Sequence, residues 1–414
     1  MIKKLMLFLL LSFVILVSAA CGNADPVEDQ EQTPIIEAEP ENAENPDLID
    51  ESEPDSDNDE RSEPALPGEW RIGIMTGSAS HNEEEYMAAL MLEQRFGADR
   101  IIRTTYPDNF GAEMGVTIAN MQMLAAEGAQ AIVVTQAVHG TISAIQSTRE
   151  MFDDDIFFFV GSAFESPVDV AQYADIAIVY DDISAGRTIV EQAHSMGAET
   201  FVHITIQRHL DMEDISERRA FLYQAATELE IQWIELIAPD PITEGLAATH
   251  QFIIENVPRS LAGHGPNVAF FATGCDMQEP LITQIANYGG FYLQCCPSPF
   301  HILPDVLNVS MDGHEGDVEF LISQTRAAIA DLGAAGRFSA GAVPVNMFLV
   351  EVGVMYSIEY LEGNIDRHDR NALRRIIDEV AASYSASVEI SNWPLDDDAF
   401  IDNFYGMLID FIRF

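Results

Sequence analysis

Lysine is almost missing from this chain of 414 residues. Lys3 and Lys4 lie within the first four residues, and every other permanently charged base is an arginine. The remaining chain therefore cannot carry out chemistry that needs a lysine. This excludes phosphate-loop nucleotide binding, Schiff-base catalysis and kinase-type phosphoryl transfer. We expect no cofactor.

Positive charge of any kind is scarce, with 20 lysines and arginines against 68 acidic residues and a formal net charge of −48. This balance excludes nucleic acid as a partner, because phosphate recognition needs concentrated basic side chains. It also excludes docking on an anionic membrane through a polybasic patch. Because 48% of the residues are hydrophobic, the chain still has enough apolar side chains for a substantial core.

Motifs of metal sites and of covalent catalysis are also missing. The four cysteines include no Cys-x-x-Cys pair, and after His314 and Glu315 the position for a second zinc-binding histidine holds Val318. A Gly-x-Ser-x-Gly nucleophile elbow is absent as well. We therefore expect no metal site, and a binding protein in preference to an enzyme.

The first 20 residues have the layout of a secretory signal. Two lysines precede the apolar run Leu5–Val17, which is too short to span a bilayer, and small residues follow it. Ser18–Cys21 resembles the bacterial lipobox, with Ser18 in place of the usual leucine, and this predicts a lipid anchor on Cys21. The alternative is an ordinary secretory signal followed by an incidental cysteine.

Residues 21–68 predict an acidic, proline-rich, disordered tether. After Cys21 this segment holds 17 acidic residues, seven prolines and one arginine, so charge repulsion keeps it extended and solvated. The run beginning at Asp55 starts like a calcium loop, but Glu60 and Leu66 replace the required glycine and glutamate. Residues 69–414 keep a net charge of −34, so the folded part is itself acidic.

From residue 69 onward, short apolar runs alternate with amphipathic helical runs. This alternation predicts an α/β fold with parallel sheets covered on both faces. Two successive series of this kind predict two doubly wound, Rossmann-like lobes joined by a hinge. Strands are expected at Trp70–Met75, Arg100–Thr104, Ala131–Thr135, Ile156–Val160 and Ile176–Tyr180, and then at Thr200–Ile206, Trp233–Ile237, Val268–Thr273, Phe291–Gln294 and Val306–Val309.

The last hundred residues have a mainly helical pattern. A short strand is expected at Ser387–Ile390, and Phe400, Phe404, Leu408 and Phe411 have the spacing of a final helix, Ala399–Phe414. We expect the first lobe to comprise residues 69–181 and about 312–385. The second lobe is then expected to comprise residues 182–311 and about 386–414.

Several stretches resemble one known family in their order along the chain. Val179–Asp182 with Gly186 is similar to the first crossover of type I periplasmic-binding proteins, and Phe270–Asp276 resembles their strand with a ligand-facing loop. Val309–Asp312 with the following His314–Asp317 resembles an uncharacterised group of bacterial lipoproteins of that fold. The resemblance covers roughly residues 69–365 and implies an extracytoplasmic receptor with two lobes.

The carboxyl ends of the expected strands supply a candidate ligand site, because ligands collect at that edge of open α/β sheets. Hydroxyls, amides, carboxylates and one arginine suit a neutral polyhydroxylated or amine-bearing ligand. The candidate ligand-binding residues are Thr76, Gly77, Ser78, Tyr106, Gln136, His139, Ser162, Asp181, Gln207, Arg208, Asp240, Asp276 and Asp312.

Each candidate has a structural alternative. Gly77 with Ser78 also fits a turn with a helix cap, Asp276 fits a helix N-cap, and Arg208 fits an exposed loop. His139 fits a helix start, and the two remaining aspartates, 181 and 312, fit the hinges. The acidic run Glu83–Glu85 is most simply a solvated first helical turn, favoured by the helix dipole.

Three cysteines follow the predicted anchor. If the strands ending at Cys275 and Cys295 are neighbours, their tips come within disulfide range, and Cys296 adds a third thiol. Three thiols cannot all pair within one chain, so one is left over.

The leading hypothesis is a lipid-anchored extracytoplasmic solute-binding receptor in the bacterial cell membrane. It closes on a small polar ligand, sugar- or nucleoside-like, and presents it to an ABC-type permease or a sensor protein. The alternative is a surface-anchored hydrolase that uses carboxylates of the cleft. A regulator's effector domain is a third hypothesis, which the signal-like start and the missing DNA-binding head disfavour.

Overall fold

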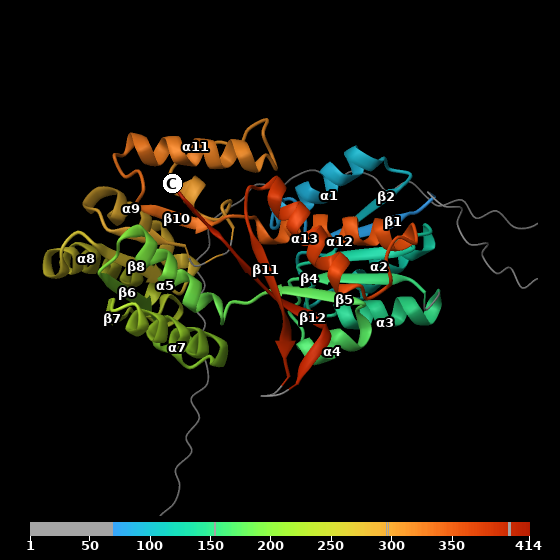
Figure 1. Cartoon of the computed structure of the whole chain (residues 1–414), viewed down its shortest axis with the longest axis horizontal. Coiled ribbons are helices and arrows are strands. Elements are labelled where there is room, and N and C mark those ends of the chain that lie inside the picture. The colour runs from blue at the N-terminus through green and yellow to red at the C-terminus, as the bar shows by residue number, and fades with distance from the viewer. Residues whose placement is uncertain (1–68, 153–154, 295, 297, 396–398) are drawn as a thin grey trace, which may run out of the picture. The chain divides into compact units, whose positions relative to one another are not determined.

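Two β-sheets organise the chain. The computed structural model describes residues 69–414 except 153–154, 295, 297 and 396–398 (Figure 1). The predicted signal, lipid anchor and tether, residues 1–68, therefore lie outside the described residues. In spatial order, the first sheet contains β11 (Val388–Pro394), β12 (Phe400–Ile409), β5 (Ile176–Tyr180), β4 (Phe157–Gly161), β3 (Ala131–Thr135), β1 (Ile72–Thr76) and β2 (Ile101–Thr105).

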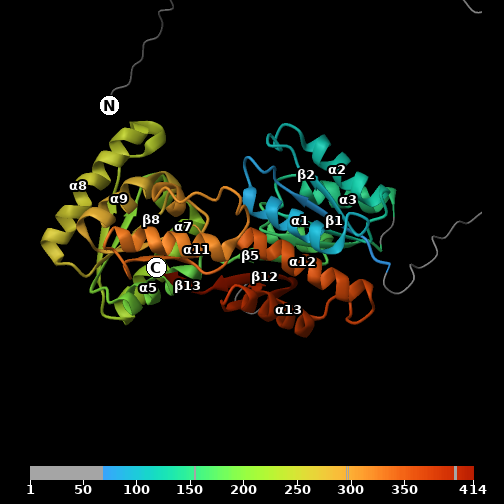
Figure 2. The same ribbon diagram turned by 90° about the horizontal axis from the view of Figure 1, so that it is seen from above.

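Helices cover both faces of this first sheet, and together they form what we call the first lobe. All of its strand pairs are parallel except β11 with β12. One face packs against α1 (Glu83–Phe96), α12 (Val345–Leu361) and α13 (Arg370–Ser383). The other face packs against α2 (Met114–Ala126), α3 (Thr141–Met151) and α4 (Pro167–Tyr173), and Figure 2 shows α2 beside α3.

The second sheet and its helices form the second lobe. Its strands, in spatial order, are β13 (Phe411–Arg413), β10 (Phe338–Gly341), β9 (Phe291–Leu293), β8 (Val268–Ala272), β6 (Thr200–Thr205) and β7 (Gln232–Ile237). Only β13 runs antiparallel to its neighbour. One face packs against α5 (Ala185–Met196) and α7 (Glu213–Glu228), and the other against α8 (Leu246–His264), α9 (Gln278–Tyr288) and α11 (Val318–Asp331).

Four short helical segments lie in the loops of the second lobe. They are α6 (Gln207–Leu210), a π-helical turn at Pro241–Gly245, a 3₁₀ turn at Cys275–Met277, and α10 (Leu303–Val306). The last two follow the adjacent strands β8 and β9, so they lie at the same edge of the sheet. This edge is where ligands collect in α/β folds.

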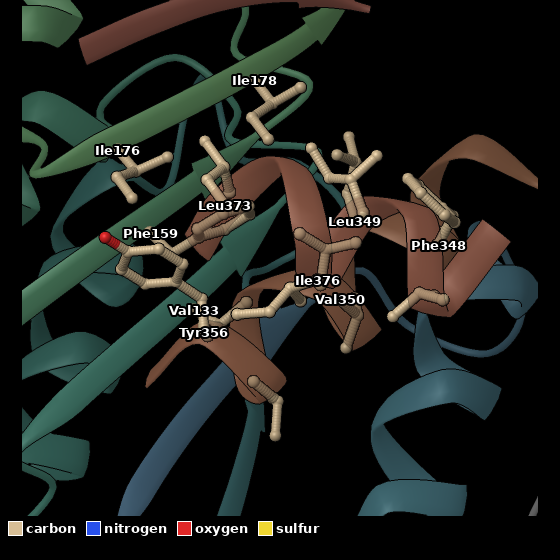
Figure 3. Packing of buried hydrophobic residues seen from close by; sticks show 14 of the residues in the cluster. Val133, Phe159, Ile176, Ile178, Phe348, Leu349, Val350, Tyr356, Leu373 and Ile376 are labelled. Atoms are coloured by element: carbon tan, nitrogen blue, oxygen red, sulfur yellow. The ribbon is translucent and has the colours of Figure 1, made fainter. Parts of the chain in front are cut away.

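Helix α12 is the centre of the first lobe's core (Figure 3). It is apolar on nearly all sides, as expected for a buried helix, and it contacts β1, β3 and β4. Gly353 permits this close approach, because a Cβ atom there would lie 2.6 Å from Phe159 Cδ1 and 2.8 Å from Val133 Cγ1.

Within the described residues from 69 onward, the chain passes between the lobes three times, after β5, after β10 and after β12. Strands β11 and β12 belong to the first sheet, whereas α11 and β10 belong with the second. This sheet membership differs from the expected division, which gave residues 312–385 to the first lobe and 386–414 to the second. The expected division placed the two later crossings near residues 312 and 386, whereas the structure places them after β10, which ends at Gly341, and after β12, which ends at Ile409.

The predicted final helix is wrong. Residues 400–409 form β12 and residues 411–413 form β13. The spacing of four between Phe400, Phe404 and Leu408 fits a helix, but β12 is inserted between β11 and β5, and its second half, residues 404–409, packs against the core on both faces. A strand buried on both faces is apolar without alternation, so periodicity alone does not identify it. The expected strand Val306–Val309 is also wrong, because α10 ends there and β10 takes its place in the sheet.

Helices in the described part of the chain are all too short or too polar to cross a bilayer.

Candidate functional site

A cavity of about 730 Å³ lies at the carboxyl ends of strands from both sheets. The first lobe lines it with the loop after β1, the start of α1, and residues that follow β3, β4 and β5. The second lobe contributes residues that follow β8 and β9, including Cys275, Ser298 and His301. Its volume is within the range of small-molecule sites.

Glu85 is a buried carboxyl group at the floor of this cavity. Its Oε1 accepts hydrogen bonds from the Gly77 backbone N–H and the Tyr106 hydroxyl, both at 3.3 Å. Burial raises the pKa of Glu85 from 4.5 to about 8. The side chain is therefore a protonated acid over much of the neutral range.

Glu84 is half-buried and joins the two lobes. Its carboxylate accepts a hydrogen bond from the hydroxyl of Ser298, which lies in the second-lobe loop after β9. Burial raises the pKa of Glu84 to about 7, while the Ser298 bond and nearby His301 oppose that rise. The expectation that residues 83–85 are only a solvated helical turn is thus wrong for Glu84 and Glu85, because the second lobe and Tyr106 cover them.

The cavity wall is acidic. Five carboxyl groups line it, from Glu83, Glu84, Glu85, Asp182 and Asp305. Among the described residues that line it, there is no arginine, and the two histidines 81 and 301 are the only bases. Because burial keeps Glu85 protonated, the wall offers hydrogen-bond donors as well as acceptors, and without an arginine it favours neutral or cationic ligands over anions.

Of the candidate ligand-binding residues, Gln136 and Ser162 line the cavity. Both follow strands directly and have left-handed backbones, with φ of 48° and 50°. Such conformations are strained for residues other than glycine and concentrate at functional sites. The Ser162 hydroxyl donates to Asn346 Oδ1 at 2.7 Å, which brings the start of α12 to the cavity.

A second group of candidates lies behind the cavity and holds the acidic wall in place. Thr76 and Tyr106 are buried, and Gly77 and Tyr106 both donate to Glu85. The Ser78 hydroxyl donates to Asp108 at 2.6 Å. Within the described chain, none of these four candidates lines the cavity.

The four candidates of the second lobe lie in the loops that follow β6, β7 and β8, and their contacts are with residues of the same lobe. Arg208 forms an ion pair with Asp240, whose carboxylate also accepts from the Ile242 N–H. Gln207 donates to Asp211. Asp276 is exposed in the turn after Cys275, and its backbone carbonyl contacts His250 at 2.9 Å. The cavity lining that the structure describes does not include any of these four candidates.

The remaining three candidates have local contacts. Asp181 accepts from the Ser184 N–H at 2.9 Å, at the first crossing between the lobes. The His139 ring packs edge-on against Phe164. Asp312 is exposed, and its backbone N–H donates to Ser310.

Two cysteines and a histidine form a cluster at the second-lobe side of the cavity. The sulfurs of Cys275 and Cys296 are 2.9 Å apart, and these sulfurs and a His301 ring nitrogen all lie within 4.8 Å of one another. The two sulfurs raise the pKa of His301 to about 10. Cys295, the predicted disulfide partner of Cys275, lies outside the described residues.

Sequence reasoning did not select Glu84, Asn346, Ser298 or His301, although all four line the cavity. The last two follow β9 within one short loop, so the rule of reading residues after a strand reaches them only if the whole loop is included. The acidic run before Tyr86 was the available signal for Glu84.

The chain has a known fold and belongs to a described family. It has the type I periplasmic-binding-protein fold, with two doubly wound sheets and three crossings. Residues 70–339 match the family described as "Protein of unknown function (DUF3798)", and the chain belongs to that family. Two uncharacterized proteins of Treponema pallidum (strain Nichols) are similar to it. One is 32% identical over 42% of this chain and 81% of that protein, and the other is 31% identical over 40% and 76%.

A solved structure shares the fold over most of the chain. A candidate transcriptional regulator from Clostridium difficile 630 aligns with a TM-score of 0.76, covering 84% of this chain and 100% of that one, at 17% identity. A sugar ABC transporter structure from Actinomyces odontolyticus aligns at 9% identity over 72% of this chain and 84% of that one. Its TM-score is 0.48.

Proposed function

We propose that the protein is an extracytoplasmic solute-binding receptor that closes its two lobes on a small polar ligand. The observation that carries this proposal is the cavity of about 730 Å³, which both lobes line at the carboxyl ends of their strands. Hinge motion of two lobes around such a cavity is a common way to enclose a ligand.

The acidic wall selects the ligand class. With five carboxyl groups and no arginine among the described lining residues, the cavity favours a neutral or cationic ligand. Gln136, Ser162 and Asn346 supply amide and hydroxyl groups that replace water on a polyhydroxylated ligand. A sugar, a nucleoside or an amine-bearing molecule fits this lining.

The anchor and the partner complete the proposal. We infer that a lipid on Cys21 holds the protein at the bacterial membrane, because Ser18–Cys21 has a lipobox-like pattern after an apolar run. The acidic tether of residues 21–68 then spaces the lobes from the surface, where an ABC-type permease or a sensor receives the ligand-bound form.

Thermal unfolding of the full chain tests ligand binding, with ribose, adenosine and spermidine as probes of the three classes. A bound probe at about 100 times its Kd raises the free energy of unfolding by about 2.7 kcal/mol. Asn346→Ala is expected to remove this gain. Asn364→Ala, whose amide donates to exposed Glu362, is the control that keeps it. If no probe raises the Tm of the full chain, the receptor proposal is wrong.

A surface-anchored hydrolase is the second candidate. It is favoured by Glu84 and Glu85, two carboxyl groups with raised pKa that line one cavity, since a general acid needs such a pKa. Turnover of nitrophenyl glycosides or of adenosine, lost in Glu84→Gln and kept in Glu83→Gln, would establish it. Stabilisation by a probe without turnover would reject it.

A further inference from the structure

Two adjacent strands bring the thiols of Cys275 and Cys296 together. Strands β8 and β9 pair in parallel, so their carboxyl ends lie side by side, with Cys275 in the 3₁₀ turn after β8 and Cys296 after β9. The two sulfurs lie 2.9 Å apart. The contact is therefore a consequence of the sheet, although 20 residues separate the two cysteines in the sequence.

His301 supplies a nitrogen to the same place. One ring nitrogen lies within 4.8 Å of both sulfurs, so three potential ligand atoms converge on one point. A disulfide between the two cysteines would give the His301 ring no role. Convergence of two sulfurs and an imidazole is instead the arrangement that binds a borderline-soft metal ion such as Zn²⁺.

The surroundings of the three side chains favour a cation and give it access from the cavity. Cys275 and His301 are exposed and Cys296 is half-buried, so an ion can reach all three from the cavity. The wall of the same cavity carries carboxyl groups and no arginine among its described residues, so no fixed arginine charge opposes a cation there. Two sulfurs on one tetrahedral zinc ion lie roughly 3.8 Å apart, so binding needs them to separate by about 1 Å.

We propose that Cys275, Cys296 and His301 form a metal site of the zinc class, with its fourth coordination position open to the cavity. Three protein ligands with an open position are typical of zinc that contacts a small molecule, whereas structural zinc has four. The metal ion would place a positive charge among the carboxyl groups. A ligand with an oxygen or nitrogen donor can then bind to the ion directly.

This assignment does not depend on the receptor proposal, because it rests on three side chains of the second lobe alone. Zinc binding without any response to sugars, nucleosides or amines would leave the metal site in place and remove the receptor. A thermal response to ribose in a chain that gives no thiolate-to-cobalt band would do the reverse.

Cobalt(II) titration of the reduced, metal-free full chain is the test. We expect one Co²⁺ per chain, with a near-ultraviolet thiolate-to-cobalt band of the intensity of two thiolates and the visible bands of a tetrahedral site. One equivalent of Zn²⁺ is expected to abolish these bands. Cys275→Ser and Cys296→Ser should each halve the thiolate band and weaken binding more than 10-fold, and His301→Ala should weaken binding with the thiolate band retained.

Two matched controls define the site. Cys295→Ser removes the neighbouring thiol, and His314→Ala removes an exposed histidine that stacks on Phe320. Both are expected to keep the wild-type cobalt spectrum. Circular dichroism of each variant checks folding, and the wild-type spectrum is a test that needs no variant at all.

Three results would overturn the proposal. One is the lack of any thiolate-to-cobalt band in the reduced wild-type chain. Another is a band that survives Cys296→Ser and is lost in Cys295→Ser. The third is a Cys275–Cys296 disulfide, found by mass spectrometry of unreduced peptides, in protein that is isolated without reductant and contains no zinc.

Discussion

The Ser298 hydroxyl donates a hydrogen bond to the Glu84 carboxylate, and this bond joins the second-lobe loop after β9 to the first turn of α1 in the first lobe. Ser298 is buried, so solvent does not readily replace this partner. Bonds to ionised groups are stronger than those between neutral groups, which makes this contact a specific tie between the lobes.

Removing that tie is expected to loosen the cavity while the two sheets stay folded. In Ser298→Ala we expect amide hydrogen exchange to speed up at the start of α1 and in residues 298–306, with a loss of about 1–2 kcal/mol in unfolding free energy. Ser310→Ala is the control, because that hydroxyl only accepts from the nearby Asp312 N–H. Equal exchange in both variants would contradict the role of Ser298.

Glu85 is expected to make the protein less stable as pH rises. Its folded-state pKa, about 8, lies above the ordinary 4.5, so the native state holds a proton that the unfolded state has released. The stabilisation is fully present below about pH 4.5 and is lost as pH rises through about 8, with Glu84 adding to the same trend.

Glu85→Gln keeps an oxygen acceptor for Gly77 and cannot ionise. Between about pH 5 and about pH 8 we therefore expect its unfolding free energy to fall less than that of the wild type. The difference between the two falls is expected to reach about 4 kcal/mol. Denaturant unfolding at several pH values measures this. Exposed Glu83→Gln is the control, and a Glu83→Gln profile as flat as that of Glu85→Gln would refute the assignment.

Gly353→Ala is expected to destabilise the first lobe by about 1–3 kcal/mol through overpacking, because the added Cβ meets Phe159 and Val133. The control is Gly263→Ala in α8, where an added Cβ meets nothing within 4 Å. There the better helix propensity of alanine should add up to about 1 kcal/mol. Opposite signs of the two changes in Tm check the prediction, and a neutral Gly353→Ala would show that α12 has room to shift.

Asp175 is the centre of a buried ion network in the first lobe. Its carboxylate pairs with Arg149 at 3.0 Å and Arg367 at 2.7 Å, and accepts from the Phe158 N–H. Asp175→Ala removes the carboxylate that neutralises both arginines, although each keeps backbone carbonyl acceptors, and is expected to cost about 3–5 kcal/mol in unfolding free energy. Glu359→Ala, which breaks a more exposed pair with Arg375, should cost about 1 kcal/mol or less. Similar losses in both variants would contradict this difference.

Cys21→Ser tests the proposed anchor. We expect the wild-type protein to sediment with membranes and to incorporate radiolabelled fatty acid, and the variant to do neither. Cys295→Ser provides the matched cysteine control and should behave as the wild type. Labelled lipid in Cys21→Ser would refute the anchor.

Parts of the fold could be predicted from the sequence because their signal is local. The runs 157–160 and 268–272 are apolar without interruption, as central parallel strands are, and each is bounded by turn residues. Strand β12 could not be predicted in this way, because its apolar residues have helical spacing and its pairing with β5 joins segments more than 200 residues apart.

The residues of the site likewise divide into those with a local signal in the sequence and those that depend on distant partners. Gln136 and Ser162 directly follow strands and were found by position. Glu84 could not be assigned, because its environment is created by Ser298 from the other lobe, 214 residues away. The cluster of Cys275, Cys296 and His301 could not be predicted either, because its members come from two loops that are close only when β8 pairs with β9.

The late position of β12 and β13 has a consequence for how the protein is made. β12 occupies an interior place beside β5, more than 200 residues earlier in the chain, and β13 pairs with β10. Neither sheet is complete until residues 400–413 have left the ribosome. Pairing between strands so far apart in the sequence is slow, because the entropy cost of closing the long loop comes before the contacts that offset it. Both sheets are therefore completed late in folding, because β12 and β13 are made after all the strands beside which they lie.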